Sequence, residues 1–436
     1  MSLPATAAVS RSSVLDRVFA DFNRVAAELP GDAAAHAARA RAAAQLRELG
    51  WPSARDEQWR YANLRAFDRL GGFGPHAAGA PDPAATLAAL RGRLELPPAL
   101  PGFERLIYLD GVHVEGTHPA LHTGAAAIVW PAEQRLGLLC DMFATDAAHL
   151  RLRGESALEI VFVGSGRASA RAAYPRLQLR CEPGSRVSLI ERHLGVAADA
   201  AAPASLVAMN LTIELARGAA LTHYRLQQCA RQTLFADTLS ARLEEHARYA
   251  VRSVAVGAGS ARTSARVQLA GRGATLAWHG IAVGRGEQVH DVTLKVEHEA
   301  PETATEELFR GIADERARVA FSGHIRIDAR APGAQTRQSL RGLIEGAAAE
   351  IDLRPRLEIL TDEVRATHGA TTGRLDEDLL FYMLARGIDR STARALLKWA
   401  FLSDALREIE LPALRAEAER LAAGQLPDVP DLGAPQ

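Results

Sequence analysis

Residues 206–227 read LVAMNLTIELARGAALTHYRLQ and contain the pattern that decides the fold, two alternating apolar runs joined by a short turn at Gly218. Leu211, Ile213 and Leu215 occupy every second position of the first run. Such spacing is typical of a strand with one buried face. No strong helix is predicted between these strands and those that follow. We therefore predict an all-β core around this stretch.

A glycine turn followed by an alternating apolar run recurs along the chain, at Gly184, Gly218, Gly273 and Gly346. Gly184 and Gly218 are 34 residues apart. Gly218 and Gly273 are 55 residues apart, which equals about two units of 27 or 28 residues. This loose period lies in the range that indicates a solenoid. We predict a β-solenoid, in which one side chain in two is buried against the stack. A β-sandwich is the second choice, because it would need tighter hairpins at regular intervals.

Strands are predicted through most of the middle of the chain. Residues 106–109 and 112–114 flank Asp110-Gly111, a hairpin signal that marks where the β region begins. Beyond a helical or irregular insert over residues 132–156, we predict a dozen strands, at residues 158–163, 176–181, 187–193, 206–215, 221–227, 233–243, 250–256, 265–269, 275–283, 288–296, 317–327 and 348–360.

Both ends of the chain are predicted to be helical. Residues 13–50 have apolar side chains at helical spacing, interrupted at Pro30-Gly31, and one short helix over residues 84–93 lies in a linker. Helical spacing returns at Asp376, and helical ends would cover the open edges of a solenoid. The predicted regions are an N-terminal helical region with linker (1–100), a β-helix core (101–362), a C-terminal helical region (363–426) and a disordered tail (427–436).

The composition excludes several classes of protein. A formal charge of -1 over 436 residues lacks the basic excess that nucleic acid or an anionic membrane favours. No apolar run approaches the ~18 residues of a membrane span, and the start has no signal-peptide pattern, so we expect a cytoplasmic protein. Three widely spaced cysteines fit a reducing compartment. The only lysines, Lys295 and Lys398, each follow leucine instead of the glycine of a phosphate-binding loop, so the chain is no P-loop ATPase by itself.

Metal and hydrolase signals are weak. The sequence has no C-x-x-C, H-E-x-x-H or G-x-S-x-G pattern. His113, His118 and His122 cluster in a loop, and His290 and His298 share one face of a predicted strand. Both groups are interpreted as polar residues and not as metal ligands, because such spacing is common without a metal.

Residues 363–388, EVRATHGATTGRLDEDLLFYMLARGI, combine a histidine, glycines, threonines and a helix start. One interpretation is a tight turn in which Gly369 and Gly373 supply unusual backbone angles, Thr372 or Asp376 caps the helix, and His368 fills a polar pocket. The other is a functional site at this junction. The residues alone leave the two interpretations open.

The segment resembles the C-terminal signature of the SufB/SufD family of iron-sulfur cluster assembly scaffolds. The matching positions are His368, Gly369, Ala370, Thr371, Gly373, Leu375, Asp376, Phe381, Tyr382, Arg386, Gly387 and Ile388. Further similarity lies at Glu57-x-Trp59-Arg60-Tyr61-x-x-Leu64, Pro175-Arg176, Glu191-Arg192-His193, residues 210–227, Phe309-Arg310-Gly311 and Arg354-Pro355-x-Leu357-Glu358-Ile359. The glycine after His368 and the N-terminal element are more similar to SufD than to SufB.

This resemblance implies a right-handed parallel β-helix with helical ends, acting as a non-catalytic scaffold. The implied partners are SufB and two copies of the ABC-type ATPase SufC. The sequence leaves open whether the isolated chain forms a homodimer. His368 matches a histidine proposed to serve the nascent cluster at the interface with SufB, and imidazole is a reasonable iron ligand. No cofactor is expected to stay on this chain alone, and an iron-sulfur cluster would be transient and shared with SufB. Ala366 stands where many relatives have a cysteine, so that position cannot accept sulfur.

The resemblance also implies that the C-terminal helices dock SufC. Candidate contacts are Leu379, Phe381, Tyr382, Arg386 and Phe401. Alternatively, the aromatic residues only pack the helices together. A different class of function is a free-standing β-solenoid that binds or cleaves carbohydrate, with Glu297 and Glu299 lining a groove. A stoichiometric ATPase partner on purification would separate the two classes.

Overall fold

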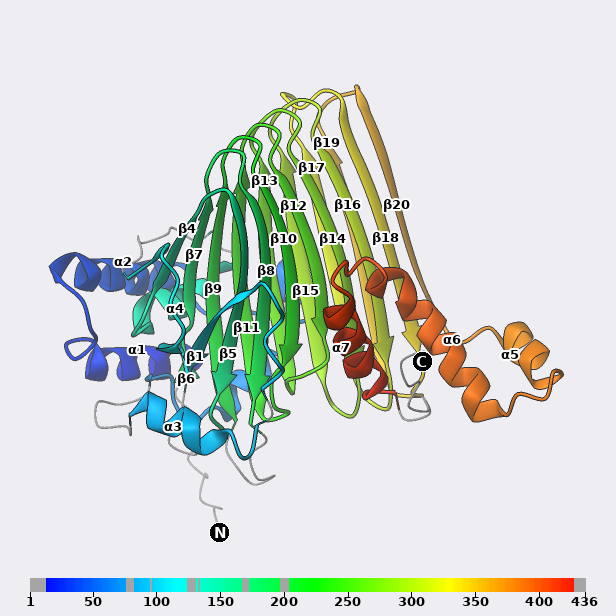
Figure 1. The fold of residues 1–436 in the computed structure, drawn as a ribbon, viewed down its shortest axis with the longest axis horizontal. Coiled ribbons are helices and arrows are strands. Elements are labelled where there is room, and N and C mark those ends of the chain that lie inside the picture. The colour runs from blue at the N-terminus through cyan, green and yellow to red at the C-terminus, as the bar shows by residue number, and fades with distance from the viewer. Residues whose placement is uncertain are drawn as a thin grey trace, which may run out of the picture.

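The computed structural model describes residues 13–75, 82–94, 96–123, 131, 134–166, 172–196 and 204–426. The predicted tail, residues 427–436, lies outside this part of the chain. The centre of the molecule is a parallel β-solenoid in which the chain passes back and forth between two ten-stranded sheets (Figure 1). Helices lie at its first turns and along the outer face of one sheet (Figure 1).

The first sheet contains, in spatial order, β2 (Val112–Glu115), β1 (Glu104–Leu109), β5 (Glu155–Gly164), β8 (Arg186–Gly195), β10 (Ala220–Gln228), β12 (Arg248–Ala255), β14 (Thr275–Gly284), β16 (Ala304–Ala313), β18 (Ala334–Ile344) and β20 (Val364–Gly373). The second contains β19 (Glu350–Ile359), β17 (Arg318–Ile327), β15 (Val289–His298), β13 (Ser260–Leu269), β11 (Thr233–Leu243), β9 (Ser205–Leu215), β7 (Arg176–Cys181), β4 (Ala148–Leu152) and β3 (Leu121–Thr123), with β6 (Ala172–Ala173) beside β9.

The register explains the loose sequence period. Ala220 of β10 pairs with Arg248 of β12, which pairs with Thr275 of β14, so successive turns of the first sheet take 28 and then 27 residues (220 to 248 to 275). Gly218 and Gly273 precede two of these strands with φ of 65° and 66°, which glycine adopts without strain. Every pairing from β5 to β20 is parallel, so the solenoid prediction is confirmed and the sandwich alternative is wrong.

The short strands β3, β4 and β6 were not predicted, and β4 lies in the stretch that was interpreted as a helical or irregular insert. Three long strands, β16, β18 and β20, were not predicted either. Their sequences, ATEELFRGIA, AQTRQSLRGLI and VRATHGATTG, are rich in polar residues and lack a continuous alternating apolar run. Glu307 and Gln338 continue the column that holds Val251 and Trp278 in the preceding turns, and both are buried. A hydrophobic pattern therefore could not reveal these strands.

The N-terminal helices follow the sequence prediction. α1 (Val14–Val25) and α2 (Ala33–Leu49) are separated at residues 30–31, and α3 (Pro83–Leu90) forms the short linker helix. Two 3-10 helices, η1 (Glu57–Trp59) and η2 (Leu64–Arg69), and α4 (Gly137–Phe143) complete this region. The apolar faces of α1, α2 and α4 pack with β6 and β9 in a second core.

The C-terminal helices differ in how they pack on the solenoid. α6 (Arg390–Leu406) and α7 (Pro412–Ala423) pack on the outer face of the first sheet, whereas α5 (Glu377–Leu384) projects away from it (Figure 1). Arg192 of β8 is fully buried beneath α7, where it donates to Glu159 at 2.6 Å and pairs with Glu417. No helix in the described ranges combines the length and apolarity needed to span a bilayer.

Candidate functional site

The last turn of the solenoid is open in the described structure. β20 pairs with β18 and β19 with β17, and each ends its sheet. β20 is exposed along almost its whole length, and Ile359 and Leu360 at the end of β19 are also exposed. An exposed strand edge presents unpaired backbone N–H and C=O groups to which another strand can add. This end is therefore a natural surface for pairing with another chain.

The predicted bend at His368 is wrong, because residues 364–373 form strand β20. Gly369 and Gly373 do not adopt positive φ, and a Cβ at either would meet open space. Thr371 is likewise an exposed strand residue. The helix start is as predicted, because the Asp376 carboxylate accepts from the backbone N–H groups of residues 378 and 379.

His368 lies on the interior-facing side of the final strand. It pairs in register with Gln338 and shares a face with Val364, which packs against the solenoid core. Gln338 pairs in turn with Glu307, and Glu307 with Trp278. Same-face neighbours on adjacent strands lie about 5 Å apart. His368 is thus the exposed outermost member of a row of side chains that continues into the solenoid.

Glu307 is a buried carboxyl group close behind His368. Burial raises its pKa to about 7, against the lowering effect of the hydrogen bond that Gln338 Nε2 donates at 2.5 Å. Its second oxygen has no hydrogen-bond partner. Gly323 on the opposite sheet provides the room, because a Cβ there would lie 2.1 Å from Gln338 Nε2 and 2.6 Å from the carboxylate.

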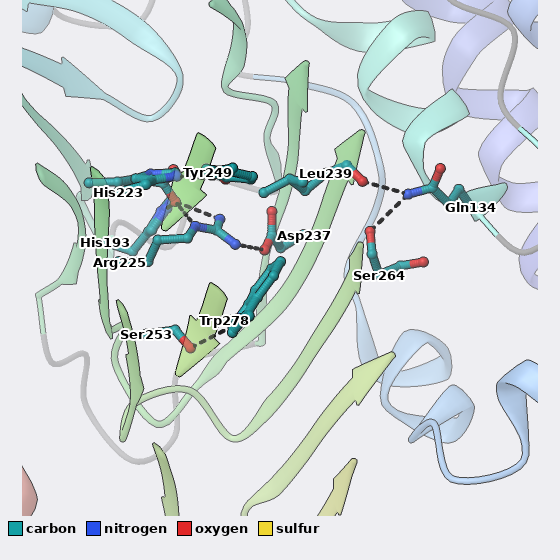
Figure 2. Close-up of polar contacts among 11 residues, drawn as sticks. Gln134, His193, His223, Arg225, Asp237, Leu239, Tyr249, Ser253, Ser264 and Trp278 are labelled. Carbon is teal, nitrogen blue, oxygen red and sulfur yellow. Dashed lines mark hydrogen bonds and ion pairs between the residues drawn. The ribbon is translucent and has the colours of Figure 1, made fainter. Parts of the chain in front are cut away.

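Further inside, a polar cluster occupies the middle turns (Figure 2). Arg225 donates to Glu191 Oε1 at 2.6 Å and forms an ion pair with Asp237 at 2.9 Å. Trp278 donates its indole N–H to Ser253 at 3.1 Å (Figure 2). All of these side chains come from strands of the two facing sheets, and most are nearly inaccessible to solvent.

The electrostatics of the cluster centre on Glu191. Burial alone would raise its pKa, but Arg225 and hydrogen bonds from His193 and His223 hold that pKa well below the usual range. Burial lowers the pKa of His223, so its ring is neutral near pH 7. A carboxylate only accepts, so His223 Nε2 carries the proton it donates to Glu191 at 3.1 Å, and Nδ1 accepts from Tyr249 at 3.0 Å.

The arrangement has room for water but little else. The cavity beside Arg225 and Asp237 measures about 50 Å³, enough for ordered water. The three cysteines are free and buried, and burial raises the pKa of Cys181 and of Cys229 to about 12 and that of Cys140 further. All three are therefore unreactive thiols near neutral pH. The interior can hold protons and water, but these thiols are poor sulfur acceptors.

No group of three or more metal-ligating side chains is found within the described ranges. His290 and His298 lie buried at opposite ends of β15, and burial lowers the pKa of each to about 4. Their interpretation as buried polar residues is confirmed.

The candidate docking residues fall into two groups. Leu379, Phe381 and Tyr382 on α5 are 51%, 72% and 55% exposed, and the Arg386 guanidinium lies 4.5 Å from the Tyr382 ring centroid. Phe401 on α6 instead packs against the core under the C-terminal helices. Phe381 therefore does not serve to pack two helices together, whereas Phe401 does contribute to packing.

The interior polar residues were not predicted to form a site. In each strand, alternate side chains point into the solenoid, and most of these are apolar, as Leu221 is on β10. The inward positions also hold Glu191, His223, Arg225 and Asp237. Polar residues at strand positions where the alternation predicts buried apolar side chains were the signal that could have revealed them.

The fold and its open end define a class of protein, a two-sided parallel β-solenoid with helices at both ends. Residues 162–401 match the family model described as "SUF system FeS cluster assembly, SufBD core domain", so the chain belongs to the SufBD family. It is 26% identical over 405 residues to the iron-sulfur cluster assembly protein SufD of Escherichia coli, covering 87% of this chain and 92% of the relative. A SufBD family protein of Synechocystis is 30% identical over 203 residues, which cover 47% of this chain and 45% of the relative. SufD of Bacillus subtilis is 31% identical over 137 residues, which cover 31% of each chain.

Proposed function

We propose that this chain is a SufD-type scaffold subunit that pairs with SufB and docks the ATPase SufC in the cytoplasm. Family membership supports the role in iron-sulfur cluster assembly. The observation that carries the pairing is the open end, where β19 and β20 expose unpaired strand edges beside apolar side chains. A homodimer through the same edges is the form expected in isolation.

His368 is proposed to hold part of the nascent cluster, which is cargo and not a resident cofactor. Its exposed imidazole lies on the strand that a partner would cover. Behind it, Glu307 and Gln338 form a hydrogen-bonded pair within the solenoid that would lie under the assembled site. The chain itself is proposed to be non-catalytic, with ATP hydrolysis in SufC.

The carbohydrate alternative has no support from the geometry. Glu297 pairs with Arg266 at 2.6 Å and Lys295 at 3.2 Å, and Glu299 accepts from Gln268 at 2.9 Å. Both carboxylates are thus engaged by neighbouring side chains of the protein.

Replacing His368 with alanine is expected to leave the fold intact, because the side chain is exposed, and to reduce cluster transfer about tenfold. The measurement is cluster delivery to an apo-acceptor by the reconstituted complex with SufB and SufC. His122→Ala, at an exposed histidine in the first part of the solenoid, is the matched control. Equal activity of the His368 variant and the parent would remove this residue from the mechanism.

The double replacement Phe381→Ser and Tyr382→Ser is expected to weaken SufC binding by about tenfold or more, because exposed aromatic side chains dominate such contacts. Stability should change by less than about 0.5 kcal/mol, since both side chains face solvent. The measurement is recovery of the ATPase on co-purification from native cells. Leu360→Ser changes another exposed apolar residue, at the open strand end, and should retain SufC. Undiminished recovery with the double variant would exclude α5 as the dock.

A further inference from the structure

A groove on the outer face of the second sheet has no role in the proposed function. It measures about 590 Å³, a size suited to a small organic molecule. Its floor comes from β13, β15, β17 and β19, and its rim from η1 and the segment before α4. It lies on a different face from the interior row behind His368.

Glu57 and Gln58, at the start of the motif Glu57-x-Trp59-Arg60-Tyr61, line one wall of this groove. Trp59 is fully buried, and the Arg262 guanidinium lies 4.0 Å from its ring centroid. Arg262 also donates to the Gln58 carbonyl at 2.8 Å. These contacts fix η1 against the sheet, so the wall is rigid and the groove is preformed.

The floor is rich in positive charge. Arg354 and Arg356 share a single carboxylate, Glu57, at 2.7 and 3.3 Å. Burial lowers the pKa of His324, and Arg356 and Lys295 lower it further. Apart from this histidine, the charged residues that line the groove are four cations and one carboxylate, an excess of positive charge that favours an anion.

Two buried polar side chains in the groove have unused hydrogen-bonding capacity. Gln134 is 1% exposed, and its amide nitrogen donates to the carbonyls of Leu239 and Ser264 at 2.8 and 2.9 Å (Figure 2). Its Oε1 therefore remains an acceptor without a partner. The hydroxyl of Thr293, a residue 9% exposed, also has no partner. Buried polar groups of this kind are normally satisfied by water or a ligand.

We propose that this groove binds a small hydroxylated organic anion. Its phosphate or carboxylate groups bind Arg354 and Arg356 and accept from Thr293, and one of its hydroxyls donates to Gln134 Oε1. The requirement for a hydroxyl distinguishes this ligand from a simple carboxylate such as acetate, and the shared positive charge admits phosphate esters and hydroxycarboxylates alike.

The test is calorimetric titration of the full-length protein at low salt with citrate, glucose 6-phosphate, inorganic phosphate and acetate. Citrate or glucose 6-phosphate is expected to bind at least about tenfold more tightly than acetate or inorganic phosphate. Binding of citrate alone assigns the groove to hydroxycarboxylates, and binding of glucose 6-phosphate alone assigns it to phosphate esters. No binding of either at about 5 mM overturns the proposal.

Substitutions inside and outside the groove test whether the anion binds there. Thr293→Val and Arg356→Gln are each expected to weaken it about fivefold or more. Arg316→Gln removes an exposed arginine that pairs with Glu287 outside the groove, and should leave the affinity unchanged. Equal weakening by Arg316→Gln and Arg356→Gln would mean that anions bind through overall charge, and would also overturn the proposal.

Discussion

Replacing Arg225 with methionine is expected to destabilise the protein by about 3–5 kcal/mol, the cost typical of breaking a buried ion pair. The guanidinium is the cation between Glu191 and Asp237, at 2.6 and 2.9 Å. Burial alone would lower the pKa of Arg225, but Asp237 and Glu191 raise it well above its ordinary value. Methionine fills similar space, so the loss comes from two buried carboxylates left without their cation.

The measurement is the urea concentration at the midpoint of unfolding, followed by circular dichroism at pH 7. Arg180→Met is the matched control, because Arg180 pairs with Glu214 at 3.0 Å on the exposed surface. It should cost less than about 1 kcal/mol. Adding Asp237→Asn to Arg225→Met should restore part of the loss, because it removes one of the unpaired charges. Similar midpoints for Arg225→Met and Arg180→Met would show that the interior ion pair contributes little.

The solenoid could be predicted because its turns repeat a local pattern. Alternating apolar residues in β9 and β10 and the glycine before each strand specify strand, turn and buried face together. The helix starts at Asp376 and Asp389 could also be predicted, because capping depends only on neighbouring residues. Interactions between residues close in sequence were therefore sufficient to predict the strands with their turns and the helix starts.

The candidate site could be predicted only in part. The segment around His368 stood out, but its glycines suggested a bend, whereas the structure extends it as an edge strand. The pairing with β18 decides this outcome, and that strand is itself hidden by polar residues. The ion pair of Arg225 with Asp237 joins strands in different sheets, so no local pattern reveals it.

Replacing Glu307 with glutamine is expected to stabilise the protein above neutral pH by up to about 3 kcal/mol. The pKa of Glu307 is raised from 4.5 to about 7 by burial. Each pKa unit corresponds to about 1.4 kcal/mol. Between these two values the folded protein binds more protons than the unfolded chain, so the contribution of Glu307 to stability is greatest below pH 4.5 and is lost as the pH rises through 7. Glutamine keeps the shape and the hydrogen bond with Gln338 without the charge.

The prediction is therefore a difference that depends on pH. At pH 5 Glu307 is protonated in the fold, and the parent and Glu307→Gln should unfold at nearly the same urea concentration, whereas at pH 8 the variant should be more stable. Glu306→Gln is the matched control, because the neighbouring carboxylate lies on the outer face, 43% exposed and 3.5 Å from His279. A stability gap for Glu307→Gln that is equal at pH 5 and pH 8 would contradict the raised pKa. A gap confined to high pH would place a titrating proton on Glu307, two strands from His368 along the same interior row.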